Sequence, residues 1–134
     1  MVNAVAVGIG CRKDTPGATI VALVRAALSR LTVEPDQVCL YSVARKANEP
    51  GMHEAAAVLG YDLVFLPDPD LAAVAGRVVT QSARVQAMLG IGSVAEAAAL
   101  AGGGPQSAIV VARLAADGAT CAIAADFSVT EDAQ

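Results

Sequence analysis

Short apolar runs alternate along this chain with segments whose apolar residues recur at helical spacing. Three of the runs predict strands, at residues 2–7, 37–43 and 62–66, and the first is typical of a buried strand in a parallel sheet. After the first run, Val21, Val24 and Leu28 recur along one side of a predicted helix, with Arg25 on the other side. This alternation of strand and helix indicates right-handed crossovers and a sheet whose strands are mostly parallel.

Proline, glycine and hydroxyl residues locate the ends of the first two predicted helices. Thr15 is the expected N-cap of the first helix and Pro16 its first residue. Pro50 is expected at the start of the second helix, and Gly60 is well placed to end it.

The second half of the chain carries three further helix signals. A short helix is expected at 70–75, capped by its first residue, and another helix at 80–89. Ser93 and Glu96 match the S-x-x-E capping box ahead of an alanine-rich segment. The glycines at 102–104 end that helix.

The last predicted element is a β-hairpin, in which strands at 108–114 and 119–125 flank the turn Ala116-Asp117-Gly118. We therefore expect an α/β fold. It is a single three-layer domain over residues 1–134, with a mostly parallel (mixed) sheet and a C-terminal β-hairpin.

Composition narrows the class of protein. The chain has 134 residues, of which 55% are hydrophobic, and its mean hydropathy is +0.55. Alanine supplies much of that fraction, and no run reaches the roughly 18 apolar residues of a membrane span. No basic segment precedes the first apolar run, so no signal peptide is expected. The net charge of -4 and the aromatic fraction of 3% argue against a nucleic-acid partner. We expect a cytoplasmic protein that binds neither membrane nor nucleic acid.

The three cysteines do not form a metal-binding or disulfide pattern. Cys11, Cys39 and Cys121 are far apart, no C-x-x-C pair occurs, and the chain has one histidine, His53. We therefore expect no metal and no other cofactor. Cys39 and Cys121 lie in apolar runs and are expected to be small buried residues, whereas Cys11 is expected in a glycine-rich loop. His53 is expected on the surface of a helix.

The candidate site lies where the first two strands are expected to end, because ligands of open parallel sheets bind beyond the carboxyl ends of the strands. If these strands are neighbours, two basic pairs converge there and attract anions. Glycine N–H groups and the following helix N-terminus can donate to such an anion. The candidate residues after the two strands are Gly8, Gly10, Cys11, Arg12 and Lys13, and then Arg45 and Lys46.

Simpler interpretations compete at the first of these positions. Gly8 and Gly10 begin a dinucleotide fingerprint that Lys13 breaks, so an ordinary tight turn is preferred. Cys11 beside Arg12 and Lys13 can be a nucleophile with a lowered pKa. No histidine is near in sequence, so a structural cysteine is preferred.

Two further pairs have alternatives that the sequence leaves open. Lys46 and Glu49 can act as acid and base, or form an ordinary ion pair within a loop. The capping box explains Ser93 and Glu96. The helix N-terminus that these residues begin, behind Gly90-Ile91-Gly92, is nonetheless a second element suited to an anion.

Four segments taken together resemble one known family. They read GIGCRK at 8–13, KANEPG at 46–51, GSVAEAAA at 92–99 and GATCAIA at 118–124. In order and spacing they resemble the cobalamin-biosynthesis family CobE, which is similar to the C-terminal domain of CbiG. The resemblance covers nearly the whole chain. The resemblance implies that nine residues of this chain occupy functional positions of the family, namely Gly8, Gly10, Cys11, Arg12, Lys46, Glu49, Gly92, Ser93 and Glu96. One position departs from the family, because Ala112 stands where a lysine is often found, although Arg113 beside it can keep the charge.

The resemblance implies a role in building the corrin ring. CbiG-type proteins open a δ-lactone of cobalt-precorrin-5A and release acetaldehyde, whereas the stand-alone CobE form belongs to the oxygen-dependent route. This chain has no room for the other CbiG domains and resembles the stand-alone form. We expect a carrier or chaperone that binds a precorrin or corrinoid intermediate through its carboxylates, alone or beside other cobalamin-biosynthesis enzymes.

Two other functions compete with the carrier. One is a hydrolase that opens the lactone, with Lys46 and Glu49 as polariser and base. The other is a nucleotide-binding module that uses the Gly8-Ile9-Gly10 turn, an assignment that Lys13 disfavours.

Overall fold

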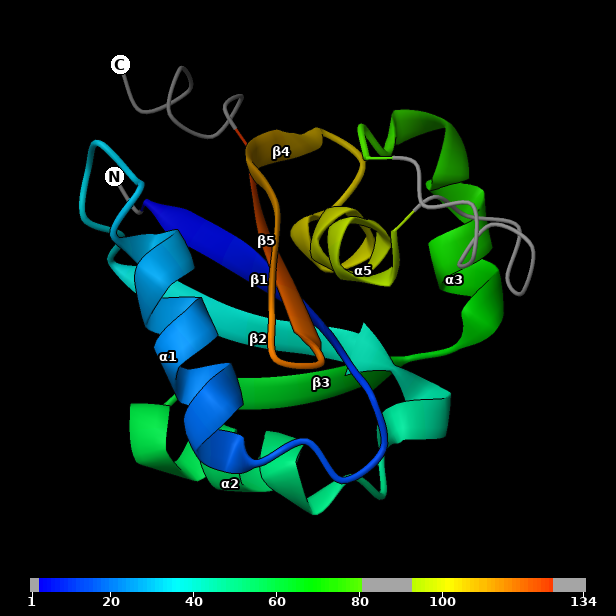
Figure 1. Ribbon diagram of the computed structural model, residues 1–134. Coiled ribbons are helices and arrows are strands. Elements are labelled where there is room, and N and C mark those ends of the chain that lie inside the picture. The colour runs from blue at the N-terminus through cyan, green and yellow to red at the C-terminus, as the bar shows by residue number, and fades with distance from the viewer. Residues whose placement is uncertain (1–2, 81–92, 127–134) are drawn as a thin grey trace.

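The computed structural model describes residues 3–80 and 93–126 as a layered α/β structure built on one twisted sheet (Figure 1). The sheet has five strands in the order β3-β2-β1-β5-β4. The strands are β1 (Ala4–Cys11), β2 (Gln37–Val43), β3 (Asp62–Leu66), β4 (Ser107–Ala116) and β5 (Ala119–Asp126). The helices are α1 (Gly17–Leu28), α2 (Pro50–Leu59), α3 (Asp68–Ala73) and α5 (Val94–Gly103), with 3₁₀ turns η1 (Ala44–Lys46) and η2 (Ala75–Arg77).

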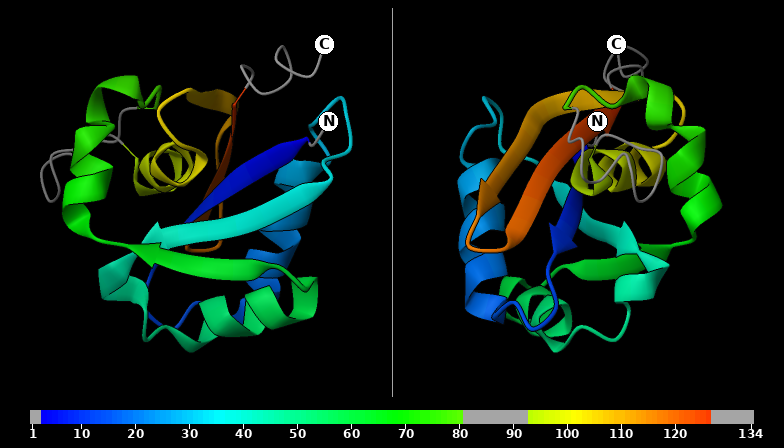
Figure 2. Two further views of the ribbon diagram at one scale, coloured as in Figure 1. Left: turned by 180° about the vertical axis from the view of Figure 1, so that it is seen from behind. Right: turned by 45° about the vertical axis from the view of Figure 1, so that its right-hand side comes forward.

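The three-layer arrangement is confirmed. Helices α1 and α2 cover one face of the sheet, and α5 with α3 covers the other (Figure 2). Strands β1, β2 and β3 are parallel neighbours, and β5 pairs antiparallel with both β1 and β4. The expected mixed sheet and C-terminal β-hairpin are therefore present, and the hairpin adds its strands beside β1.

Several helix ends follow the sequence signals. Pro50 is the first residue of α2, and Gly60 ends that helix in the left-handed conformation, with φ 76°. Ser93 is the N-cap of α5, and its hydroxyl accepts a hydrogen bond from the main-chain nitrogen of Glu96 at 3.2 Å. Gly104 terminates α5 with φ 93°.

Two predicted caps are wrong. Helix α1 begins at Gly17, and Pro16 occupies the N-cap position. The hydroxyl of Thr15 instead donates to the carbonyl oxygen of Arg12 at 2.8 Å, which fixes the loop before the helix. Asp70 lies inside α3 and does not cap it, because that helix already begins at Asp68. The helix expected at 80–89 falls almost wholly outside the described residues.

The predicted glycine-rich turn after the first strand is also wrong, because β1 continues through Gly8 and Gly10 to Cys11. Gly8 pairs with Tyr41 on one side and with Ala122 on the other. A Cβ atom at Gly8 would overlap the main-chain oxygen of Ala95 in α5. The glycine therefore lets the helix lie directly on the strand, which is a packing role.

The core has two parts, one on each face of the sheet. Between the sheet and α1 with α2, the largest buried side chains include Ile9, Ile20, Leu40 and Met52. Burying an aliphatic side chain of this size contributes roughly 1.5–3 kcal/mol. On the other face, alanines of α5 keep that helix close to the sheet. Within residues 3–80 and 93–126, no helix combines the length and apolar character needed to cross a membrane.

Candidate functional site

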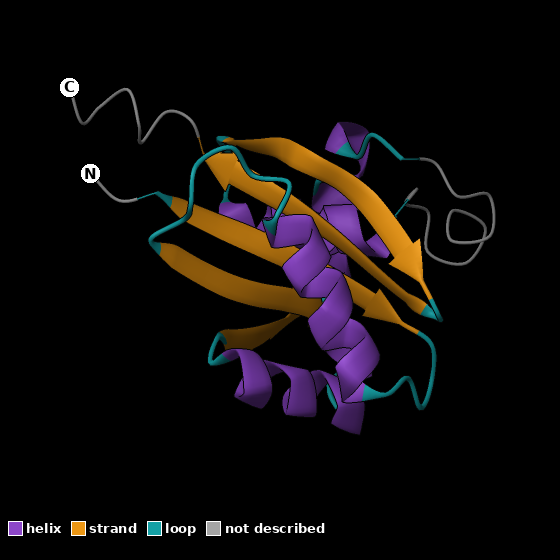
Figure 3. Cartoon of the chain, turned by 60° about the vertical axis from the view of Figure 1, so that its left-hand side comes forward, coloured by secondary structure: helices purple, strands orange, loops and turns teal. Residues whose placement is uncertain are grey.

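A cleft of about 900 Å³ opens at the edge of the sheet where β1 and β2 end. The chain after β1 and the η1 turn after β2 form one side of it. The β4–β5 hairpin and the first turn of α5 form the other side. The hairpin lies beside the end of β1 because Cys11 pairs with Ala119 (Figure 3). The loops that follow β1 and β2 both line this cleft, as expected, because the two strands are parallel neighbours and end at the same edge of the sheet.

The described lining of this cleft contains five basic residues and one acidic residue, Asp117, on a protein whose net charge is -4. Its basic side chains are Arg12, Lys13, Arg45, Lys46 and Arg113. Arg45 donates to Asp68 at 2.8 Å, in an ion pair that is largely exposed. The other four have no ion-pair partner among the described residues. The cleft therefore offers several free cations to an anionic ligand.

Cys11 lies half-buried in the cleft, but its thiol is not activated. Burial raises the pKa of Cys11, the positive charge of Lys46 lowers it in part, and the negative charge of Glu49 raises it further. The net direction is upward, so the thiol is protonated at neutral pH. This direction disfavours the alternative of a nucleophile with a lowered pKa and agrees with the structural cysteine that the sequence analysis preferred.

Glu49 and Lys46 do not form an ion pair with each other in the described part of the chain. The carboxylate of Glu49 accepts a hydrogen bond from the main-chain nitrogen of Asp14 at 3.1 Å. Asp14 has a positive φ of 65°, a conformation that Asp tolerates better than most residues. This bond joins the loop after β1 to the start of α2, and so fixes the two basic loops relative to each other.

Glu96 is placed differently from what the capping box implies. Its side chain is fully buried, and its carboxylate accepts hydrogen bonds from residues distant in sequence. Oε1 accepts from the nitrogens of Val79 and Thr80 at 2.9 and 2.8 Å. Oε2 accepts from the Thr80 hydroxyl at 2.6 Å and from the nitrogen of Arg113 at 2.9 Å. Burial alone would raise the pKa of Glu96, but these bonds together outweigh it and lower the pKa.

The other residues that the sequence singled out differ in where they lie. Gly10 and Ser93 line the cleft, and Ser93 is buried there. Gly8 does not line it, for the packing reason given above. Gly92 lies outside the described residues. His53 is exposed on α2, as expected, and its Nε2 lies 2.6 Å from the carbonyl oxygen of Ala47.

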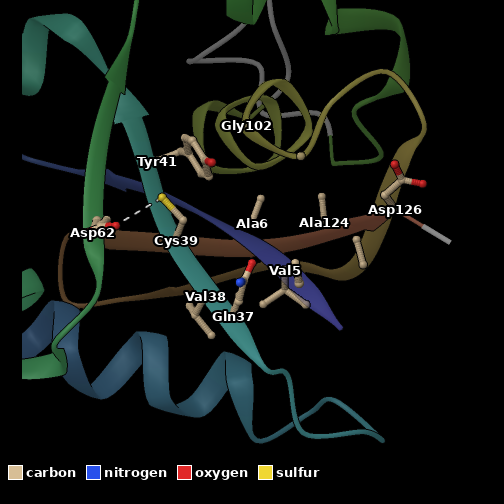
Figure 4. A pocket seen from close by; sticks show the side chains of 13 residues that line it. Val5, Ala6, Gln37, Val38, Cys39, Tyr41, Asp62, Gly102, Ala124 and Asp126 are labelled. Carbon is tan, nitrogen blue, oxygen red and sulfur yellow. Dashed lines mark hydrogen bonds between the residues drawn. The ribbon is translucent and has the colours of Figure 1, made fainter. Parts of the chain in front are cut away.

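A second hollow, of about 590 Å³, lies at the opposite end of the sheet (Figure 4). It is lined by the starts of β1 and β2, the last turn of α5 and the end of β5. Cys39, Tyr41 and Asp62 line one part of it, and burial, reinforced by Cys39, raises the pKa of Tyr41 to about 12. No basic side chain is among its described lining residues, so this hollow does not suit an anion.

The comparisons with known proteins agree with this fold. The sequence profile described as "Cobalamin synthesis G C-terminus" matches residues 5–124. This chain belongs to that family. It is a cobalamin-biosynthesis protein of the CobE and CbiG C-terminal type.

Individual relatives support this assignment. Protein CobE from Sinorhizobium sp is 34% identical over 118 residues, which are 87% of this chain and 77% of that protein. The crystal structure of CobE, described as a protein from the cobalamin (vitamin B12) biosynthetic pathway, superposes with a TM-score of 0.82 at 30% identity, covering 92% of this chain and 91% of the other. The cobalamin biosynthesis protein chiG from Agrobacterium tumefaciens str. C58 gives a TM-score of 0.68 at 33% identity, covering 90% and 97%.

The four sequence motifs contribute residues to both sides of the cleft, but they do not include every basic residue that lines it. The hairpin side contributes Arg113, which sequence reasoning noted as a neighbour of Ala112 without placing it in the site. Ala112 is exposed and outside the cleft lining, whereas Arg113 lines it.

Proposed function

We propose that this protein binds a precorrin intermediate of cobalamin biosynthesis through the carboxylates of the macrocycle and acts as its carrier or chaperone. The observation that supports this proposal is the set of basic side chains around the 900 Å³ cleft. A precorrin bears many carboxylates around a large flat ring. Arginine and lysine bind carboxylates by charge-assisted hydrogen bonds, which are roughly twice as strong as neutral ones.

The rest of the lining fits a ligand held by its rim. Apolar contacts come from small or branched residues such as Val43, Val94 and Ala119, and the cleft contains no aromatic side chain among its described residues. Ring stacking is therefore not available there, and affinity has to come from charge, from main-chain donors and from small apolar contacts. The main-chain nitrogen of Arg12 already donates to the Gly118 oxygen at 2.8 Å, so the side chain of Arg12 is the available donor at that position.

One observation favours a second candidate function, the opening of a δ-lactone with release of acetaldehyde. Lys46 and Glu49 both act electrostatically on Cys11, so an acid, a base and a thiol lie near one another, although only Lys46 and Cys11 of the three line the cleft. Against it, the pKa of Cys11 is raised and the Glu49 carboxylate is engaged by Asp14. The carrier is therefore the function that the geometry supports better.

The test is to purify the protein from cells that synthesise the corrin ring and to record the absorption spectrum of any pigment that co-elutes. We expect a bound tetrapyrrole in near-stoichiometric amount. Replacing Arg12 and Lys46 with alanine should remove it, whereas Arg30→Ala, which deletes an exposed arginine outside the cleft, should not. Acetaldehyde release by the pigment-loaded protein would favour the hydrolase. Pigment-free protein, or equal pigment in the Arg12 and Lys46 variants, would contradict the carboxylate-binding site.

A further inference from the structure

Arg113 stands on the opposite side of the cleft from the other basic residues. Arg45 and Lys46 follow β2, and Arg113 lies on β4. In the strand order, β1 and β5 lie between β2 and β4, so three inter-strand spacings separate the two groups. At about 4.8 Å each, these spacings separate the strand backbones that carry the two groups by roughly 14 Å. A ligand that engages both groups therefore needs carboxylates on opposite edges of an extended framework.

Glu96 fixes the backbone at Arg113. Its Oε2 accepts from the main-chain nitrogen of Arg113, at a point where the pairing of β4 with β5 is irregular. An irregular strand has lost part of the ladder that would otherwise fix its side-chain directions. The buried carboxylate replaces the missing restraint and connects β4 to α5.

A carboxylate is the group that this position requires. Donors approach both oxygens of Glu96, from Val79, Thr80 and Arg113. An ionised carboxylate only accepts, whereas an amide would direct its own N–H donors at some of these groups. The residue is fully buried. Each unmatched donor would therefore cost the desolvation of a polar group.

We infer that Arg113 is a specificity-determining residue for ligands whose carboxylates lie on opposite edges, and that Glu96 is the positioning residue that aims it into the cleft. This inference rests on the proposed binding of a polycarboxylate and adds the geometry by which one is selected. Glu96 itself makes no ligand contact in this scheme, because its carboxylate is engaged by protein donors.

The experiment compares two fluorescent porphyrins as probes. Uroporphyrin carries eight carboxylates around the whole ring, and deuteroporphyrin carries two on one edge. Wild-type protein should bind uroporphyrin more tightly. Arg113→Ala should reduce that preference about tenfold, which corresponds to one lost charge-assisted contact of roughly 1.4 kcal/mol. Arg113→Lys should restore part of it, and Arg30→Ala should leave it unchanged.

A double-variant cycle separates positioning from mere structural support. Glu96→Gln should reduce the uroporphyrin preference of the folded protein, and adding Arg113→Ala should produce little further loss, because both changes remove one interaction. Independent, additive losses would overturn the positioning role. If Glu96→Gln does not fold, Arg113→Ala still tests the specificity role. The donor to Glu96 is the main-chain nitrogen of residue 113, so Arg113→Ala keeps that hydrogen bond. Failure of wild-type protein to bind uroporphyrin would contradict the proposed function, whereas binding with an unchanged preference in Arg113→Ala would overturn this inference alone.

Discussion

The carboxylate of Glu49 accepts a hydrogen bond from the main-chain nitrogen of Asp14 at 3.1 Å, across a sequence separation of 35 residues. This contact ties the loop that carries Arg12 and Lys13 to the start of α2, close to Lys46. The acidic residue that the family resemblance suggested as a base therefore has a defined structural task, which is to hold two cationic loops together.

This task leads to a prediction for two Glu49 variants. Glu49→Ala should lower the free energy of unfolding by about 1 kcal/mol and weaken uroporphyrin binding, because the loop loses its restraint. Glu49→Gln keeps an acceptor oxygen and should retain both properties. Urea denaturation and fluorescence titration measure them. Equal loss in the two variants would show that the charge of Glu49, and not its hydrogen bond, is what matters, as an acid–base role requires.

The contact between β1 and α5 gives a second prediction. Gly8→Ala should destabilise the protein by about 1–3 kcal/mol, because its methyl group would overlap the Ala95 oxygen and force the helix away from the strand. Gly76→Ala is the matched control, since a Cβ there meets no atom within 4 Å. Thermal unfolding of both variants should show a large shift for the first and almost none for the second. Comparable shifts would contradict the packing role of Gly8.

Local patterns predicted most of the fold, because most of its strands and helices have an apolar run, a helical spacing or a terminating proline or glycine within their own sequence. Strands β2 and β3 match the predicted ranges, and the hairpin turn lies at Asp117 and Gly118. The end of β1 could not be predicted, because glycine is a poor strand former. Gly8 is needed in the strand only because α5, more than 80 residues later, packs directly on it. A close approach of this kind leaves no periodic signal near Gly8.

The site could be predicted only in part, because contacts between segments distant in sequence also position its residues. Arg12 and Lys46 follow adjacent parallel strands, so topology alone brings them together. Placing Arg113 requires the antiparallel order β1-β5-β4, which depends on long-range pairing. Glu96 matched a capping box, and that local match concealed the donors to its carboxylate, which lie 16 and 17 residues away in sequence.

The pH dependence of alkylation at Cys11 tests the electrostatics of the cleft. Burial and Glu49 raise the pKa of this thiol, and Lys46 lowers it. Iodoacetamide should therefore modify Cys11 slowly at neutral pH and faster only at alkaline pH. Lys46→Ala should raise the pKa further and slow the reaction, and Glu49→Gln should lower the pKa and speed it.

Mass spectrometry of the peptide that contains residue 11 follows this reaction apart from Cys39 and Cys121. Cys121 is fully buried, and burial raises its pKa to about 12, so it serves as an internal unreactive reference. Rapid labelling of Cys11 at neutral pH, or identical rates in both variants, would contradict the charge arrangement.

Acid sensitivity should depend on Glu96. Its pKa is lowered in the folded protein, so its contribution to stability is present above the unfolded pKa of about 4.3 and is lost as the pH falls through the folded pKa. Glu96→Gln should be less stable than wild type at neutral pH, with a shallower decline of stability below about pH 5. Urea denaturation across this range measures both. Parallel curves for the two proteins would show that Glu96 does not titrate with folding.

The Arg45–Asp68 ion pair predicts a variant that binds more tightly than wild type. The pair is largely exposed, so its own contribution to stability is small, at roughly 0–1 kcal/mol. Asp68→Asn should free the Arg45 guanidinium for a ligand carboxylate and raise the affinity for uroporphyrin roughly two- to fivefold. Because this gain is electrostatic, it should shrink at high salt. Asp70→Asn removes the same charge from the same helix without releasing Arg45, so it is the matched control. If Asp68→Asn and Asp70→Asn changed the affinity equally, the gain would come from net charge, and Arg45 would not be a ligand-binding residue.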